Sequence, residues 1–105
     1  MYPLGVYHER MIADIKQRAV NRSNVIEGQF KGLRKAIENE AYCMDILTQS
    51  LAIQKSLASL NKLILENHMR THISDMMTSG DEAVQQQALD ELLKLYELNN
   101  VRGNK

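Results

Sequence analysis

The strongest constraint on the fold is a stretch without Gly or Pro that runs from about Ala41 to Met76. Apolar side chains and two histidines recur near one side of a helix there, at Leu47, Leu51, Leu57, Leu60, Ile64, His68 and His72. Helical periodicity without a helix-breaking residue predicts one long helix. Because one layer of helices in a chain of 105 residues buries a limited core, we expect the chain to associate with copies of itself.

A shorter helix is expected on each side of the long one. Apolar positions at helical spacing predict the first from about Glu9 to Ile37, with Asn39 as a cap for the helix that follows. Residues 78–82 interrupt the pattern, and Ser79 followed by Glu82 has the spacing of a capping box for a third helix. That helix carries Val84, Ala88, Leu89, Leu92, Leu93 and Tyr96.

Composition favours an all-α fold. Gly and Pro are scarce, Trp is absent, and the apolar residues are mainly Leu, Ile, Met, Ala and Val, which suit helices better than sheets. We expect a single domain over residues 1–105, with a short flexible arm at 1–8 and a polar tail at 99–105. There is no run of about 18 apolar residues and no signal-peptide layout, so we expect a cytoplasmic protein without a membrane partner.

The charges are unevenly distributed although the net charge is zero. Residues 1–37 are rich in Lys and Arg, whereas residues 72–99 are acidic and contain Lys94 as their single base. The basic half is therefore suited to meet the phosphates of a nucleic acid. Ordinary charges on a solvated helix face remain the alternative explanation.

His68 and His72 lie four residues apart, so their imidazoles project from one helix face and can share a metal ion. Cys43 is the single cysteine and cannot form an internal disulfide; it is a small buried hydrophobe, a ligand or a reactive thiol. It faces the same side as His68 but lies about 37 Å away along the helix. Antiparallel packing of two copies would join Cys43 of one chain to both histidines of the other.

A thiolate with two imidazoles suits Cu(I) in three-coordination, or Zn(II), Ni(II) or Co(II) if further ligands join. His8 is a possible extra ligand, although a lone histidine near a terminus is more often only exposed to solvent. Catalysis has little support, because the chain has no nucleophile elbow and no glycine-rich phosphate loop, and no histidine lies near Cys43 in the sequence. We therefore expect a protein that is not an enzyme.

From about residue 15 to 98 the chain resembles the CsoR/RcnR family of copper-sensing and nickel/cobalt-sensing repressors. The matching segments are Asn21-Arg22, Ile26-Glu27-Gly28-Gln29, Gly32-Leu33, Ala41-Tyr42-Cys43-Met44-Asp45-Ile46-Leu47, Gln49, Ala52, Leu65-Glu66-Asn67-His68 and His72. The resemblance implies a three-helix protomer, an antiparallel dimer and a dimer-of-dimers tetramer. It further implies that the tetramer binds operator double-stranded DNA without a helix-turn-helix and releases it when metal binds Cys43, His68 and residue 72.

The family's patterns leave the choice of metal open. Copper-sensing members typically use Cys-His-Cys, whereas the last position here is His72. Nickel and cobalt sensors share that histidine but also use one near the N-terminus, where this chain has Met11 with His8 one turn away. Tyr42 and Glu91 match residues with which copper-type members connect the site to the third helix. Without the resemblance, Tyr42 would be interpreted as a residue that packs at the start of a helix, and Glu91 as a solvent-exposed acid.

For DNA, the family match falls on Arg22, and Ser23-Asn24 replaces the family's usual Leu-Lys. Further expected phosphate contacts are Lys31, Arg34, Lys35, Lys55 and Lys62. Our hypothesis is a repressor of metal efflux or detoxification genes that responds to Cu(I), with Ni(II) or Co(II) as the alternative effector. Two rivals are a metal-buffering helical protein and a family member whose Cys43 reacts with an electrophile such as formaldehyde.

Overall fold

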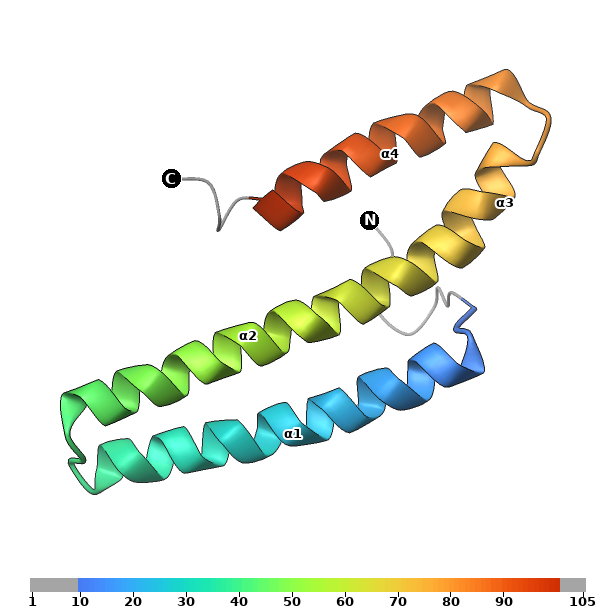
Figure 1. The fold of residues 1–105 in the computed structure, drawn as a ribbon. Coiled ribbons are helices and arrows are strands. Elements are labelled where there is room, and N and C mark those ends of the chain that lie inside the picture. The colour runs from blue at the N-terminus through green and yellow to red at the C-terminus, as the bar shows by residue number, and fades with distance from the viewer. Residues whose placement is uncertain (1–9, 101–105) are drawn as a thin grey trace. The chain divides into compact units, whose positions relative to one another are not determined.

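The computed structural model describes residues 10–100, and His8 and residues 101–105 lie outside this range. Within it, the secondary structure consists of α1 (Ala13–Glu38), α2 (Cys43–His68), the π-helix η1 (Met69–Ile73), α3 (Ser74–Met77) and α4 (Glu82–Asn100) (Figure 1). The segments α2, η1 and α3 follow one another without a break, so the described residues form three helices. The all-α prediction is confirmed, and the long helix extends from Cys43 to Met77 instead of from Ala41 to Met76.

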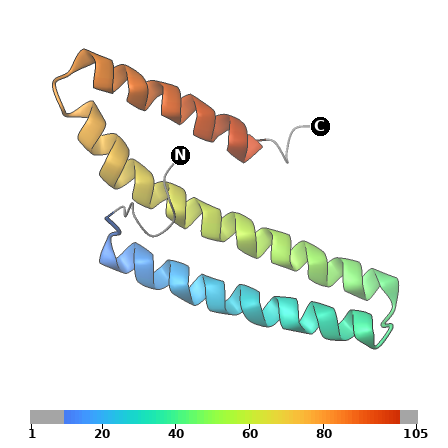
Figure 2. The ribbon, with the colours of Figure 1, turned by 180° about the vertical axis from the view of Figure 1, so that it is seen from behind.

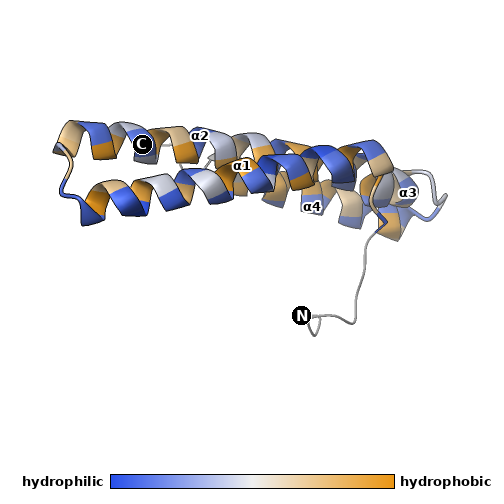
Figure 3. Cartoon of the chain, turned by 90° about the horizontal axis from the view of Figure 1, so that it is seen from below, coloured by the Kyte–Doolittle hydropathy of each residue, from blue (hydrophilic) through white to orange (hydrophobic). Residues whose placement is uncertain are grey.

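Residues 10–67 form a helical hairpin in which α1 and α2 run antiparallel, side by side, as the front and back views both show (Figures 1 and 2). The contact is made by Ile15 and Ala19 of α1 and Leu63 of α2, all buried, with Ile12 and Leu60 packed against them. Both helices carry polar and apolar residues in alternation along their length (Figure 3).

Large apolar side chains of the hairpin remain exposed in the single chain. They include Val20, Val25, Phe30, Ile37, Leu47, Leu51, Leu57 and Ile64. Leu47 and Leu51 are 55% and 57% exposed, values typical of surface residues and not of a core. Where exposed apolar side chains form a contiguous patch, that patch usually marks an interaction site. No helix within residues 10–100 combines the length and hydropathy that a membrane span requires.

The first helix begins at Ala13, not at the predicted Glu9, because Asn67 holds the preceding residues extended. Its Oδ1 accepts the backbone N–H of Ile12 at 2.8 Å, and its Nδ2 donates to the carbonyl of Arg10 at 3.0 Å. Asn67 is only 3% exposed, and Ile12 has an extended backbone with φ −65° and ψ 129°. A buried amide with both of its ends paired fixes this segment against α2.

Replacing Asn67 with alanine is expected to lower the free energy of unfolding by about 1–3 kcal/mol, since it leaves part-buried backbone groups of residues 10 and 12 without their partners. Chemical denaturation monitored by circular dichroism measures this. Asn61→Ala is the matched control, because Asn61 is exposed on the same helix and carries the same gain in helix propensity. Equal unfolding midpoints for the two variants would show that the amide of Asn67 does not hold the segment.

The turn between α1 and α2 corrects the predicted role of Asn39. Asn39 ends α1 and does not cap α2. Glu40 follows with φ 55°, its N–H bonds to the carbonyl of Ile37, and that of Ala41 bonds to the carbonyl of Ala36. These two bonds form a Schellman motif, in which a left-handed residue satisfies the last carbonyls of a helix.

Residues 68–100 form the second unit, in which α3 and α4 pack together and Ile73 and Ala88 are buried. Gly80, with φ 82°, makes the turn between them, a conformation that glycine adopts without strain. The cap of α4 is Asp81, whose Oδ1 accepts the N–H of Ala83 at 2.9 Å, and not Ser79 as predicted. Ser79 instead accepts the N–H of Asp81 through its hydroxyl at 3.1 Å.

Candidate functional site

The two histidines predicted to share a metal lie next to each other in the second unit. His68 is the last residue of α2 and His72 lies within η1. Their ring centroids are 5.1 Å apart, with the ring planes inclined by 31°. The two rings are therefore neighbours on one side of this helix.

His68 is also tied to α4 through Glu91. Its Nε2 lies 2.9 Å from Oε1 of Glu91, and the side chain of His68 is only 18% exposed. An ionised carboxylate only accepts hydrogen bonds, so Nε2 must carry the proton, and Nδ1 is the ring nitrogen whose lone pair can bind a metal. A ligating histidine whose other nitrogen donates to a carboxylate is the usual arrangement in protein metal sites.

Cys43 lies at the opposite end of the same helix. It is the first residue of α2 and is exposed, so its thiol is accessible to a partner or a reagent. The neighbouring Tyr42 is 72% exposed, and its carbonyl accepts the N–H groups of Asp45 and Ile46 at the start of the helix. Within one chain, the backbone of Tyr42 thus accepts the first hydrogen bonds of α2, while its side chain is exposed.

Residues 10–100 of one chain do not bring three candidate ligands together. The length of α2 separates Cys43 from His68, about 37 Å at the rise of an α-helix. Among residues 10–100, no group of three His, Cys, Asp or Glu side chains is placed to hold a metal ion. The available donors, two imidazoles and one exposed thiol, are of the types that Cu(I) and Zn(II) accept. Each chain therefore carries two separate parts of one potential site.

A basic groove lies between the two helices of the first unit. It is lined by Arg18, Asn21, Arg22, Val25, Ser59, Lys62, Leu63 and Glu66. The structure thus brings together Arg22 and Lys62, two of the predicted phosphate contacts, and adds Arg18, which the sequence analysis did not single out. The signal for Arg18 was available, because it lies four residues before Arg22 on one helix face. Its ion pair with Asp14, at 3.5 Å, is exposed, and exposed ion pairs contribute little to the stability of a fold.

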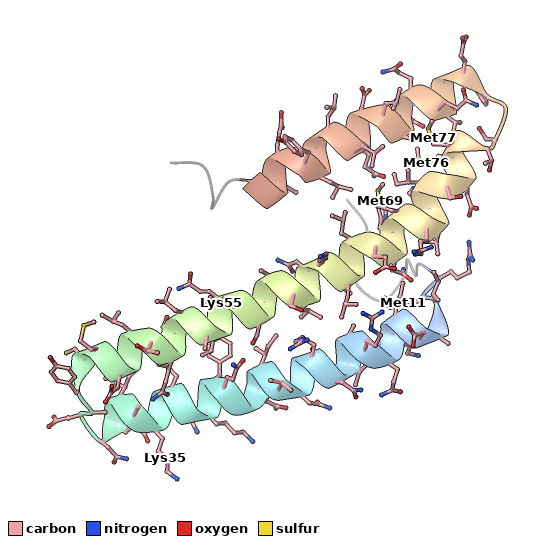
Figure 4. The ribbon with its side chains drawn as sticks, viewed as in Figure 1. Met11, Lys35, Lys55, Met69, Met76 and Met77 are labelled. Atoms are coloured by element: carbon pink, nitrogen blue, oxygen red, sulfur yellow. The ribbon has the colours of Figure 1, made fainter. Side chains whose placement is uncertain are left out.

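The other predicted bases lie outside this groove. Lys31, Arg34, Lys35 and Lys55 are exposed. Lys35 extends from the side of α1 that faces away from α2, and Lys55 from the side of α2 that faces away from α1 (Figure 4). Arg34 is 3.9 Å from the carboxylate of Glu38 on the same helix. Only two of the six predicted bases therefore line the groove.

Comparison with known proteins places these features in a family. The profile of the family described as metal-sensitive transcriptional repressor matches residues 15–97. The copper-sensing transcriptional repressor CsoR of Bacillus subtilis (strain 168) is 37% identical over 81 residues, which are 77% of each chain. CsoR of Mycobacterium ulcerans (strain Agy99) is 35% identical over 82 residues, 78% of this chain and 68% of the relative.

A further relative is an RcnR protein, the other type of repressor in the family that the sequence resembles. The transcriptional repressor RcnR of Salmonella arizonae is 30% identical over 82 residues, 78% of this chain and 88% of the relative. The matches span α1, α2 and most of α4, and so include the paired histidines, Cys43 and the basic groove. The chain belongs to the CsoR/RcnR family of metal-sensitive transcriptional repressors, which are DNA-binding regulators and not enzymes.

Proposed function

We propose that this protein is a copper-responsive repressor whose metal-free form binds operator DNA and whose Cu(I)-bound form releases it. The site consists of Cys43 from one copy and His68 and His72 from another, in an antiparallel dimer that pairs into a tetramer. The regulated genes are those of metal efflux or detoxification.

The observation that carries the proposal is the pair of adjacent imidazoles, one of which is already bonded to α4. His68 and His72 are close enough to share an ion, and His68 presents Nδ1 while Glu91 holds Nε2. When Nδ1 of His68 serves as a ligand, its Nε2–H becomes a stronger donor to Glu91. The state of the site is thereby communicated to α4.

The need for two copies follows from the chain's geometry. Cys43 begins α2 and His68 ends it, so antiparallel pairing about a two-fold axis brings each thiol to the other chain's histidines. The exposed leucines of α2, Leu47, Leu51 and Leu57, supply apolar surface for such pairing. Symmetry then creates two equivalent sites in each dimer.

Cu(I) is the first choice of effector because a thiolate is a soft ligand and the nearby carboxylate of Glu91 is already bonded to His68. The relatives named copper-sensing support this choice. Ni(II) or Co(II) is the second choice, supported by the RcnR relative and by two imidazoles in place of one. These ions, like Zn(II), would require further ligands, and His8 lies outside the described residues.

The link through Glu91 makes a specific prediction. Glu91→Gln is expected to retain Cu(I) binding, at an affinity about 10–100-fold lower, and to lose most of a coupling free energy of about 1–3 kcal/mol between metal and DNA. Operator affinity measured with and without Cu(I) gives this coupling. Glu97→Gln, an exposed acid on the same helix, is the control and should behave as wild type. Full coupling in Glu91→Gln would exclude this route to α4.

The proposed function is tested by fluorescence anisotropy on DNA from upstream of the protein's own gene, titrated anaerobically with Cu(I) and separately with Ni(II). Release by near-stoichiometric Cu(I) and not by Ni(II) is the expected result. Release by Ni(II) alone would favour a nickel/cobalt sensor. Binding of metal without any DNA binding at low salt would contradict the repressor and leave a metal buffer.

A further inference from the structure

The basic groove of the first unit contains one arginine whose charge already has a partner. Arg18, Arg22 and Lys62 all line the groove, and Asp14 does not. Within residues 10–100, Arg22 and Lys62 have no hydrogen-bond or ion-pair partner. Nη1 of Arg18, in contrast, lies 3.5 Å from Oδ2 of Asp14, one turn earlier on α1. Arg18 is therefore a groove residue that is paired with an acid from outside the groove.

The ion pair between Arg18 and Asp14 is weak enough to be exchanged for another partner. The two side chains are 56% and 78% exposed, so water and salt screen their attraction. Their separation of 3.5 Å exceeds the distance of about 2.7–2.9 Å that is typical of a hydrogen bond between two charged groups. A guanidinium bonds a phosphate at this shorter distance and often through two N–H groups at once. A phosphate in the groove is thus the stronger partner for Arg18.

The other polar groups of the groove also suit a phosphate. Asn21 accepts a hydrogen bond from Nε2 of Gln17 through its Oδ1 at 3.0 Å, which leaves the two N–H groups of its Nδ2 as donors. The hydroxyl of Ser59 can donate as well. Phosphate oxygens accept hydrogen bonds, and among the residues that line the groove Glu66 is the single acid against three bases. The groove therefore offers donors and positive charge to an anion.

We propose that Arg18 is a further contact to the phosphates of operator DNA, and that Asp14 competes with the DNA for it. This inference rests on the DNA binding of the proposed function. When DNA binds, Arg18 exchanges the carboxylate of Asp14 for a phosphate. Part of the attraction between Arg18 and the phosphate is offset by the loss of the ion pair, so Asp14 lowers the affinity of the groove for DNA.

A double-mutant cycle tests this exchange, with operator affinity of the metal-free protein measured by fluorescence anisotropy. Arg18→Ala is expected to weaken binding about tenfold, and its plot of log affinity against log salt should be shallower by about 0.9. Asp14→Asn is expected to strengthen binding about two- to fivefold, since Arg18 no longer has to leave a partner. In the double variant this gain should disappear.

The cycle separates the exchange from other effects of the acid. Asp14 lies in the first turn of α1, where its charge also stabilises the helix, and this effect is the same with or without Arg18 and cancels. Lys16→Ala is the matched control, because Lys16 is exposed on the same helix, about 200° around the axis from Arg18, and does not line the groove. It should keep the affinity and the salt slope of wild type.

Two results would overturn the inference while the repressor function stands. One is wild-type affinity in Arg18→Ala, and the other is an equal gain from Asp14→Asn with and without Arg18, which would reduce the role of the acid to general repulsion of DNA. A wild-type chain that does not bind operator DNA at low salt would overturn the proposed function itself, and the inference with it.

Discussion

Replacement of Cys43 with alanine is expected to abolish the release of DNA by Cu(I) while operator binding by the metal-free protein is retained. The thiolate is the strongest soft donor of the proposed site, and changes to outer partners alone lower metal affinity by about 10–100-fold. The affinity for Cu(I) should therefore fall by more than about a hundredfold when Cys43 is replaced. Anaerobic chelator competition measures the affinity, and anisotropy on operator DNA measures the response.

The fold itself should tolerate this change, because Cys43 is exposed and contributes no core packing. The thermal unfolding midpoint of the metal-free variant serves as the control and is expected to match that of wild type. A retained Cu(I) response in Cys43→Ala would refute the site assignment.

His72→Ala separates metal sensing from reaction of the thiol with an electrophile. A metal sensor should lose its response to Cu(I), because one of the two adjacent imidazoles is removed. A protein that senses formaldehyde through a nucleophilic thiol should respond to that reagent almost as wild type does. Parallel anisotropy titrations of wild type and His72→Ala with Cu(I) and with formaldehyde distinguish the two mechanisms.

Periodicity predicted the helices well and their ends less well, for identifiable reasons. The stretch without Gly or Pro gave the long helix to within two residues at its start and one at its end. The start of α1 was wrong because the amide of Asn67, more than 50 residues away in sequence, pairs with residues 10 and 12. Ser79 and Asp81 are both good capping residues, and local spacing alone does not decide which of them caps α4.

The candidate site was predictable in part. The spacing of His68 and His72 indicated a shared face, and the adjacent rings agree with that interpretation. The bond between His68 and Glu91 joins residues 23 apart, so only the family resemblance pointed to it. The π-helix at Met69–Ile73 has no signature in the hydrophobic pattern. That two copies pair antiparallel, and that the second copy completes the site, stays a prediction.

Arg22→Ala is expected to weaken operator binding at least tenfold while Cu(I) affinity stays unchanged. Arg22 lines the groove between α1 and α2 together with Arg18 and Lys62, where three bases converge on one surface. A charge-assisted hydrogen bond to phosphate contributes about 1.5–3 kcal/mol, and about 1.4 kcal/mol corresponds to a tenfold change in affinity. Binding to phosphates also releases counterions, so the plot of log affinity against log salt should become shallower by about 0.9 for each phosphate that the variant no longer neutralises.

Lys94→Ala is the matched control, since it removes one positive charge from α4, outside the groove. It should leave both operator affinity and the salt slope near their wild-type values, which shows that position and not net charge determines the effect. Lys35→Ala and Lys55→Ala then test whether the exposed bases beyond the groove also reach phosphate (Figure 4). Arg22→Ala with the affinity and slope of wild type would remove the groove from the DNA interface and shift it to those outer faces.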